Sequence, residues 1–143
     1  MIVKEEFGRV SQFRMARLLN GQALYTMAVY WVDGLLIDTG PFHVAPEIED
    51  AFTGFKIDKI VNTHHHEDHI GNNIIFEKKG IPIFAHPLAL PLIKNPSTWI
   101  ALLHDYQLLV WGGTASFKPH TVRKLHQHRQ LQFQSTSHSR SFI

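Results

Sequence analysis

The sequence predicts a layered α/β domain. Three observations support this fold class: a hairpin signal at Asp33-Gly34, a short apolar strand that ends in a run of histidines, and an alternation of strands and helices around that strand. Hairpins followed by such an alternation are typical of domains in which helices cover a sheet. The 143 residues, of which 44% are hydrophobic, are enough for one domain with its own core.

The first predicted strands form a hairpin. Residues 24–32 are rich in β-branched and aromatic side chains, and residues 35–37 are apolar. A two-residue hairpin turn requires a positive φ at both turn positions. Asp and Gly tolerate this conformation better than most residues, so Asp33-Gly34 between the two segments favours such a turn. Gly40-Pro41 ends the second strand.

Strands and helices then alternate. Pro46 favours the start of a helix, and apolar residues follow it at helical spacing. Residues 57–61 read as a short buried strand, and residues 69–79 as a helix that Gly80 ends. Another short strand is expected over residues 81–85, and an amphipathic helix over residues 98–110.

The composition excludes several kinds of site. The chain has no cysteine, so disulfides, thiolate zinc sites and cysteine nucleophiles are absent. Its first residues lack the apolar stretch of a signal peptide, and no apolar run approaches the ~20 residues of a membrane span. We therefore expect a cytoplasmic protein without a membrane partner.

Charge is unevenly distributed along the chain. Residues 1–105 contain all 12 acidic residues, whereas five of the 14 basic residues follow them. A basic tail can indicate nucleic-acid binding. This interpretation is the less favoured one, because the aromatic residues that stack on bases are sparse from residue 117 onward: Phe117, Phe133 and Phe142.

The chemistry is expected at residues 64–69, His-His-His-Glu-Asp-His. Side chains alternate in an extended segment, so His64 and His66 can bind one ion while His65 points elsewhere. Asp68 and His69 follow after the chain turns and can bind a second ion. Imidazole and carboxylate groups suit zinc, and also iron or manganese. A surface tract or a tag is the alternative, but the cluster is internal, follows an apolar strand and contains an aspartate.

Residues 63–72, with this motif inside them, resemble the signature of the metallo-β-lactamase superfamily, His-x-His-x-Asp-His at the end of a strand. Residues 34–41 are similar to the family's strand that ends in Asp-Thr-Gly, and residues 80–86 and 110–113 resemble later segments. The resemblance covers about residues 8–118 and points to metal-dependent hydrolases of the glyoxalase II-like kind.

The resemblance implies an αββα sandwich with two zinc ions between its sheets, of which this chain is the N-terminal part. His64 and His66 would bind the first metal, and Asp68 and His69 the second. A metal-bound hydroxide, which Asp68 would help to direct as the catalytic residue, would attack an ester, thioester, lactone or related bond of a small molecule. Asp38 is expected to support the site without binding metal.

Three other histidines are expected to be ordinary polar residues. They are His43, His86 and His104, each of which stands alone in the sequence.

The chain departs from the family pattern after about Phe117. We divide it into an incomplete metallo-β-lactamase-like domain, residues 1–117, and a basic, acid-free tail, residues 118–143. A one-nucleotide shift of reading frame across residues 138–142 can encode Thr-Pro-Gly-His-Ser, the turn that carries a third histidine in the family. We favour an out-of-frame tail. The alternative is a genuine, diverged tail in which His138 is that third ligand.

The function expected is therefore a metal-dependent, zinc hydrolase, and the activity of this chain alone is left open. The alternative is a non-catalytic metal-binding fragment or a frameshift product. The oligomeric state and the identity of the substrate are not predicted by the sequence.

Overall fold

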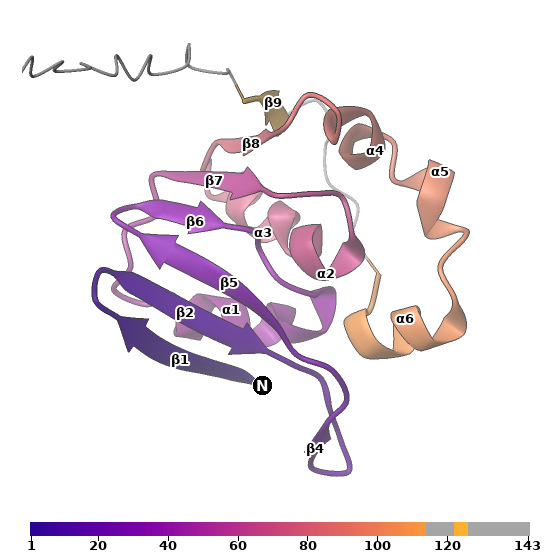
Figure 1. Cartoon of the computed structure of the whole chain (residues 1–143), viewed down its shortest axis with the longest axis horizontal. Helices are drawn as coiled ribbons and strands as arrows, with labels where there is room; N and C mark the ends of the chain where they lie inside the picture. Colours follow the sequence, from indigo (N-terminus) through magenta and orange to yellow (C-terminus); the bar gives the residue numbers. More distant parts are fainter. Residues whose placement is uncertain (114–121, 126–143) are drawn as a thin grey trace, which may run out of the picture.

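Seven strands form one mixed sheet in the computed structural model, which describes residues 1–113 and 122–125 (Figure 1). The sheet order is β1-β2-β5-β6-β7-β8-β9. Strands β1 to β6 pair antiparallel, and β6 to β9 pair parallel. The bounds of the strands are β1 (Ile2–Phe7), β2 (Val10–Met15), β5 (Met27–Val32), β6 (Leu35–Ile37), β7 (Lys59–Asn62), β8 (Ile83–Ala85) and β9 (Val122–Lys124). The mixed sheet confirms the predicted α/β fold class.

Short helices cover one face of this sheet, behind it in Figure 1. The rings of Phe52 and Phe76 pack against the core, with Phe52 4.3 Å from Phe13 of β2 and 5.9 Å from Phe76. The helices are η1 (Phe42–Val44), α1 (Ala45–Ala51), α2 (Glu67–Ile70), α3 (Asn73–Lys78), α4 (Leu90–Lys94), α5 (Ser97–Ile100) and α6 (Asp105–Trp111), and a small hairpin joins β3 (Leu18–Leu19) to β4 (Gln22–Ala23). None of the helices within residues 1–113 and 122–125 is long and apolar enough to cross a lipid bilayer.

The predicted hairpin is confirmed. Val32 pairs with Leu35, so the loop between β5 and β6 has two residues, Asp33 and Gly34. Their φ angles are 46° and 87°, as this type of turn requires. The helix predicted at Pro46 is also confirmed, because the proline lies in the first turn of α1.

The helix predicted over residues 69–79 is wrong as one continuous element, because it is divided into α2 and α3. The division coincides with Gly71, where the chain packs closely against an earlier loop. A Cβ atom at this position would lie 2.5 Å from the backbone nitrogen of Phe42 and 2.7 Å from the carbonyl oxygen of Gly40. Asn72 then donates hydrogen bonds to the carbonyl oxygens of Thr39 and Pro41.

The helix predicted over residues 98–110 is likewise two helices, α5 and α6. His104 has an extended backbone, with φ −72° and ψ 154°, and begins α6 as its N-cap. The side-chain oxygen of Gln107 accepts a hydrogen bond from the backbone N–H of His104 at 2.9 Å. This capping box starts a new helix where the apolar periodicity indicates a continuous one.

Three strands of the seven-stranded sheet, and the small β3–β4 hairpin, lie outside the predicted elements. Strands β1 and β2 form an antiparallel pair at one edge of the sheet, and the charged residues of β1 give it no apolar strand pattern. Strand β9 lies within the segment that the sequence analysis separates as a tail, yet Val122 is 1% exposed and pairs with Ile83. The boundary at residue 117 stays a prediction, and His138 and residues 126–143 lie outside the described residues.

The described helices leave the other face of the sheet uncovered (Figure 1). The strand register places Tyr30 opposite Ile37, and Ile37 opposite Val61, which is next to Phe84. Tyr30 is 37% exposed. An apolar second face is expected of one half of a two-sheet sandwich, so it agrees with the predicted αββα architecture.

Buried amides join β7 to α3. Asn73 and Asn62 exchange two side-chain hydrogen bonds, at 2.8 and 3.1 Å, and the hydroxyl of Thr39 donates to the same oxygen of Asn73 at 3.0 Å. All three residues are at most 1% exposed. A buried amide without a partner is costly, so this network fixes α3 relative to the ends of β6 and β7.

Replacing Asn73 with leucine should lower the free energy of unfolding by about 2–4 kcal/mol, because both polar atoms of the Asn62 side chain lose their partner. The double variant Asn62→Leu/Asn73→Leu should lose less than the single one, since no unpaired amide remains. Urea denaturation of the three proteins measures this difference. A double variant that loses as much stability as Asn73→Leu, or more, would contradict this explanation.

Candidate metal centre

The candidate site lies where two parallel strands end. Ile37 of β6 pairs with Val61 of β7, so the loops that follow these strands start beside each other. Asp38 comes directly after β6, and Thr63 and His64 come directly after β7. The carboxyl ends of parallel strands are a frequent place for ligand sites in α/β proteins.

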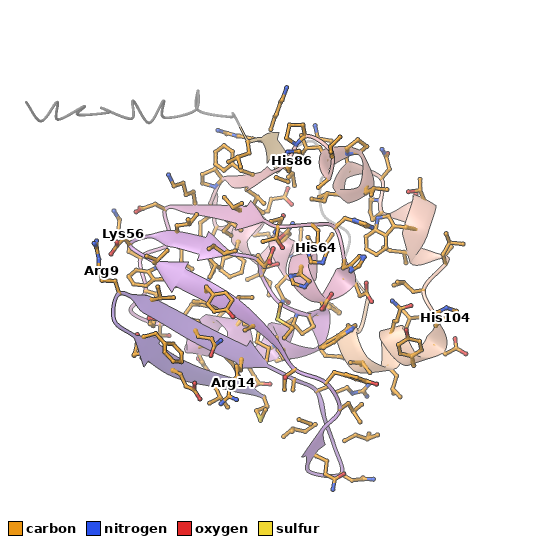
Figure 2. All side chains as sticks on the ribbon, viewed as in Figure 1. Arg9, Arg14, Lys56, His64, His86 and His104 are labelled. Carbon is orange, nitrogen blue, oxygen red and sulfur yellow. The ribbon has the colours of Figure 1, made fainter. Side chains whose placement is uncertain are left out.

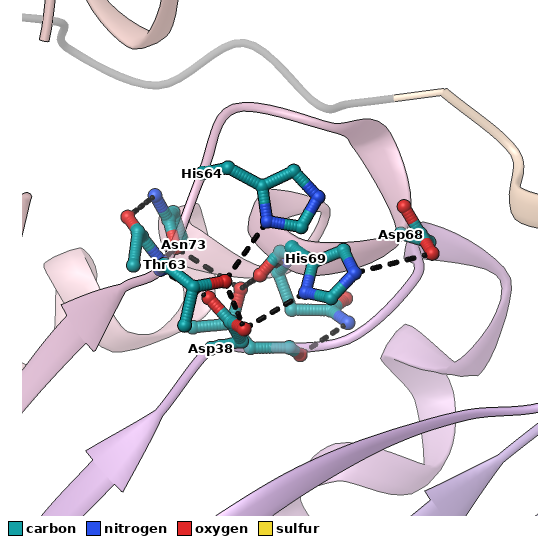
Figure 3. A network of polar contacts seen from close by, with 9 residues as sticks. Asp38, Thr63, His64, Asp68, His69 and Asn73 are labelled. Atoms are coloured by element: carbon teal, nitrogen blue, oxygen red, sulfur yellow. Dashed lines mark hydrogen bonds and ion pairs between the residues drawn. The ribbon is translucent and has the colours of Figure 1, made fainter. Parts of the chain in front are cut away.

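Three side chains converge at this edge (Figure 3). His64, Asp68 and His69 each offer one ligand atom, and these atoms lie within 4.8 Å of one another. Nε2 of His69 is 3.4 Å from Oδ2 of Asp68, and the rings of His64 and His69 are 4.0 Å apart. All three are partly buried. Two imidazoles and one carboxylate suit a zinc ion, and also iron or manganese.

His66 is not a member of this group. It is exposed, it is the N-cap of α2, and its ring lies 4.6 Å from the ring of His64. The group combines one residue of the first predicted ligand pair with both residues of the second. The assignment of His64 and His66 to one ion, and of Asp68 and His69 to another, stays a prediction.

Asp38 fixes the orientation of His69. Its Oδ2 accepts a hydrogen bond from Nδ1 of His69 at 2.8 Å, and its Oδ1 accepts one from the backbone N–H of Thr63 at 2.8 Å. The aspartate is 3% exposed and has a φ of 64°, a conformation that costs a non-glycine residue roughly 1–3 kcal/mol. These contacts agree with the expectation that Asp38 supports the site, and they leave Nε2 of His69 facing Asp68.

The same carboxylate acts on His64 through Thr63. The threonine hydroxyl donates to Oδ2 of Asp38 at 2.7 Å, so its oxygen is an acceptor for Nδ1 of His64, 2.9 Å away. With the proton on Nδ1, Nε2 of His64 carries a lone pair. One carboxylate therefore selects the ring nitrogen that each histidine offers to a ligand. The role of Thr63 is not visible in the sequence, since only its contacts reveal one.

The pKa shifts follow from these contacts. Burial disfavours the charged form of His69, but its hydrogen bonds to Asp38 and Asp68 outweigh burial and raise its pKa to about 9. Burial opposes ionisation of Asp68, but its bond to His69 and the charge of that residue lower its pKa. Burial and the positive charges of His69 and His66 lower the pKa of His64. A metal ion at Nε2 of His69 would therefore displace a proton.

The two remaining residues of the motif contact the helices that follow. The ring of His65 packs edge-on against Trp99, with the ring centres 5.2 Å apart. Glu67 is 2% exposed, and its Oε1 accepts a hydrogen bond from Nε2 of Gln107. His65 thus points away from the ligand group, as expected.

The lone histidines have structural contacts of their own, and Figure 2 shows His86 and His104 apart from His64. Nε2 of His43 lies 3.0 Å from the carbonyl oxygen of Leu109, near the end of α6. Nδ1 of His86 accepts a backbone hydrogen bond after β8, and His104 caps α6. None of the three belongs to the ligand group found among the described residues, and their role as ordinary polar residues stays a prediction.

Comparisons with known proteins support the fold. Two solved structures have a similar fold: a metallo-β-lactamase from Pontibacter korlensis (19% identity, 68% of this chain and 49% of that chain, TM-score 0.58) and MEM-A1, a subclass B3 metallo-β-lactamase from a soil metagenome library (18% identity, 84% and 44%, TM-score 0.55). This chain thus spans less than half the length of either protein.

The sequence itself matches a family profile over most of its length. Residues 29–140 match the profile of the metallo-beta-lactamase superfamily, and the matched range includes the ligand group. This range covers more than half of the chain. The chain therefore belongs to the metallo-β-lactamase superfamily.

Proposed function

We propose that this chain carries metal ligands of a zinc-dependent hydrolase that cleaves an ester, thioester, lactone or related bond in a small molecule. The observation that supports the proposal most directly is the convergence of His64, Asp68 and His69 within 4.8 Å, with both histidines oriented by Asp38. The donors, two imidazoles and a carboxylate, suit zinc and also iron or manganese, and we propose zinc because the resemblance to the family implies it.

His64, Asp68 and His69 would hold the metal, with His66 as a further ligand on the edge of the group. A bound zinc ion would supply Lewis-acid chemistry, polarising the substrate carbonyl and making water nucleophilic near neutral pH. The proposal includes a second ion, with the ligands divided between the two ions as the family resemblance implies.

Asp68 is proposed as the catalytic carboxylate. Its side chain is 18% exposed, so water and a small substrate can reach it. In the metal-free site, the hydrogen bond and positive charge of His69 lower the pKa of Asp68, and a bound cation would favour the ionised carboxylate in the same way. An ionised carboxylate can accept a hydrogen bond from the attacking water and orient it toward the substrate carbonyl.

A second candidate is a metal-binding module without catalysis. Within residues 1–113 and 122–125, the one group of histidine and acidic residues close enough to share an ion has three members. Three ligands can retain a zinc ion, so the described residues alone permit binding without turnover.

Replacing His64 with alanine should lower zinc affinity at least about tenfold, because one of three converging donors is lost. Competition with a chromophoric chelator measures the affinity. His86→Ala is the matched control, since this exposed histidine follows the next strand and lies outside the group, and it should bind like the wild type within about twofold. Equal affinity in all three proteins would rule out the proposed site.

Asp38→Asn should lower zinc affinity by about 10–100-fold, because the neutral amide loses the charged hydrogen bond to His69. Asp33→Asn is the control: it makes the same chemical change at another positive φ, in an exposed turn. We expect it to leave affinity unchanged. If both variants bind zinc equally well, Asp38 does not organise the site.

Turnover separates the two candidate functions. The hydrolase proposal predicts that the zinc-loaded chain cleaves a chromogenic thioester or lactone faster than zinc alone, and that His64→Ala removes this activity. Zinc binding with no turnover of either substrate would favour the non-catalytic module.

A further inference from the structure

Two residues of the motif outside the ligand group contact one later segment, residues 97–107. His65 contacts Trp99 of α5, and Glu67 accepts a hydrogen bond from Nε2 of Gln107 in α6 at 3.1 Å. The two contacts join residues that lie 34 and 40 positions apart in the chain, respectively. The segment therefore contacts the motif on both sides of His66.

The contact of Glu67 with Gln107 is the stronger of the two, because it is a hydrogen bond to a buried carboxylate. Glu67 is 2% exposed, and it occupies the first position of α2, directly before Asp68 and His69. Helix α2 has four residues and no side-chain cap. Because a single helical turn has little stability of its own, the direction in which α2 starts depends on tertiary contacts such as this one.

Gln107 is itself fixed at both ends of its amide. While Nε2 donates to Glu67, Oε1 accepts from the backbone N–H of His104 at 2.9 Å. The other end of α6 is held by Arg17, which donates to the carbonyl oxygen of Leu109. The donor that reaches Glu67 thus belongs to a helix anchored at each end, and it can define where the carboxylate lies.

We propose that Gln107 is a positioning residue for the metal centre: by fixing Glu67, it sets the start of α2 and so brings Asp68 and His69 toward His64. The inference rests on the proposed function, because it requires that these residues bind zinc. Gln107 does not touch the metal in this account and acts only through Glu67.

Gln107→Met tests the inference, since methionine has a similar length and no donor. We expect zinc affinity to fall about tenfold, as is usual when a group that supports a metal ligand is lost. The matched control is Gln12→Met, which removes another glutamine that donates to a side chain, here the hydroxyl of Tyr30, on the exposed face of β2. This control should bind zinc like the wild type.

The double variant Glu67→Gln/Gln107→Glu reverses the hydrogen bond and keeps the total charge. An oxygen of the new glutamate remains to cap His104, so affinity should return to within about twofold of the wild type. Thermal melting without zinc should show that all variants fold. This rescue separates a positioning role from a loss of stability.

Each outcome bears on one claim. A wild-type chain that does not bind zinc would overturn the proposed function together with this inference. Equal affinity of the wild type and Gln107→Met would overturn the inference alone. The inference would also fall if the double variant binds as weakly as Gln107→Met, since the hydrogen bond would then not be the cause.

Discussion

The candidate metal centre depends on the hydrogen bonds of one buried carboxylate. Asp38 accepts from His69 directly and from Thr63, whose hydroxyl in turn contacts His64. One side chain at the end of β6 therefore orients two histidines that follow β7. The residue holds a positive φ of 64°, and its hydrogen bonds compensate for that strain.

The parallel pairing of β6 and β7 makes this arrangement possible. It starts both loops at the same edge, and the buried amides of Asn62 and Asn73 then hold α3 beneath them. Gly71 lets the chain between α2 and α3 pack against the backbone of the loop after β6. The sheet thus provides a rigid support, and the site is built from the loops at its edge.

The sequence predicted those elements whose conformation depends on residues that are adjacent in the chain. Asp33-Gly34 specified its hairpin because the turn requires positive φ, and the ligand motif was visible because its residues are consecutive. The division of two predicted helices was missed, because it depends on backbone packing at Gly71 and on capping by Gln107. Roles for residues such as Thr63 arise from contacts that periodicity does not encode.

X-ray absorption at the zinc edge of the zinc-loaded chain tests the central claim most directly, since it reports the ligands of the ion itself. The account predicts scattering from at least two imidazole rings, with zinc–nitrogen distances of about 2.0–2.1 Å and at least one oxygen ligand. This two-ring signal should be lost when His64 and His69 are both replaced by alanine, which leaves at most the ring of His66 near the ion. A shell of oxygen ligands alone, or a spectrum that the double replacement leaves unchanged, would contradict the account.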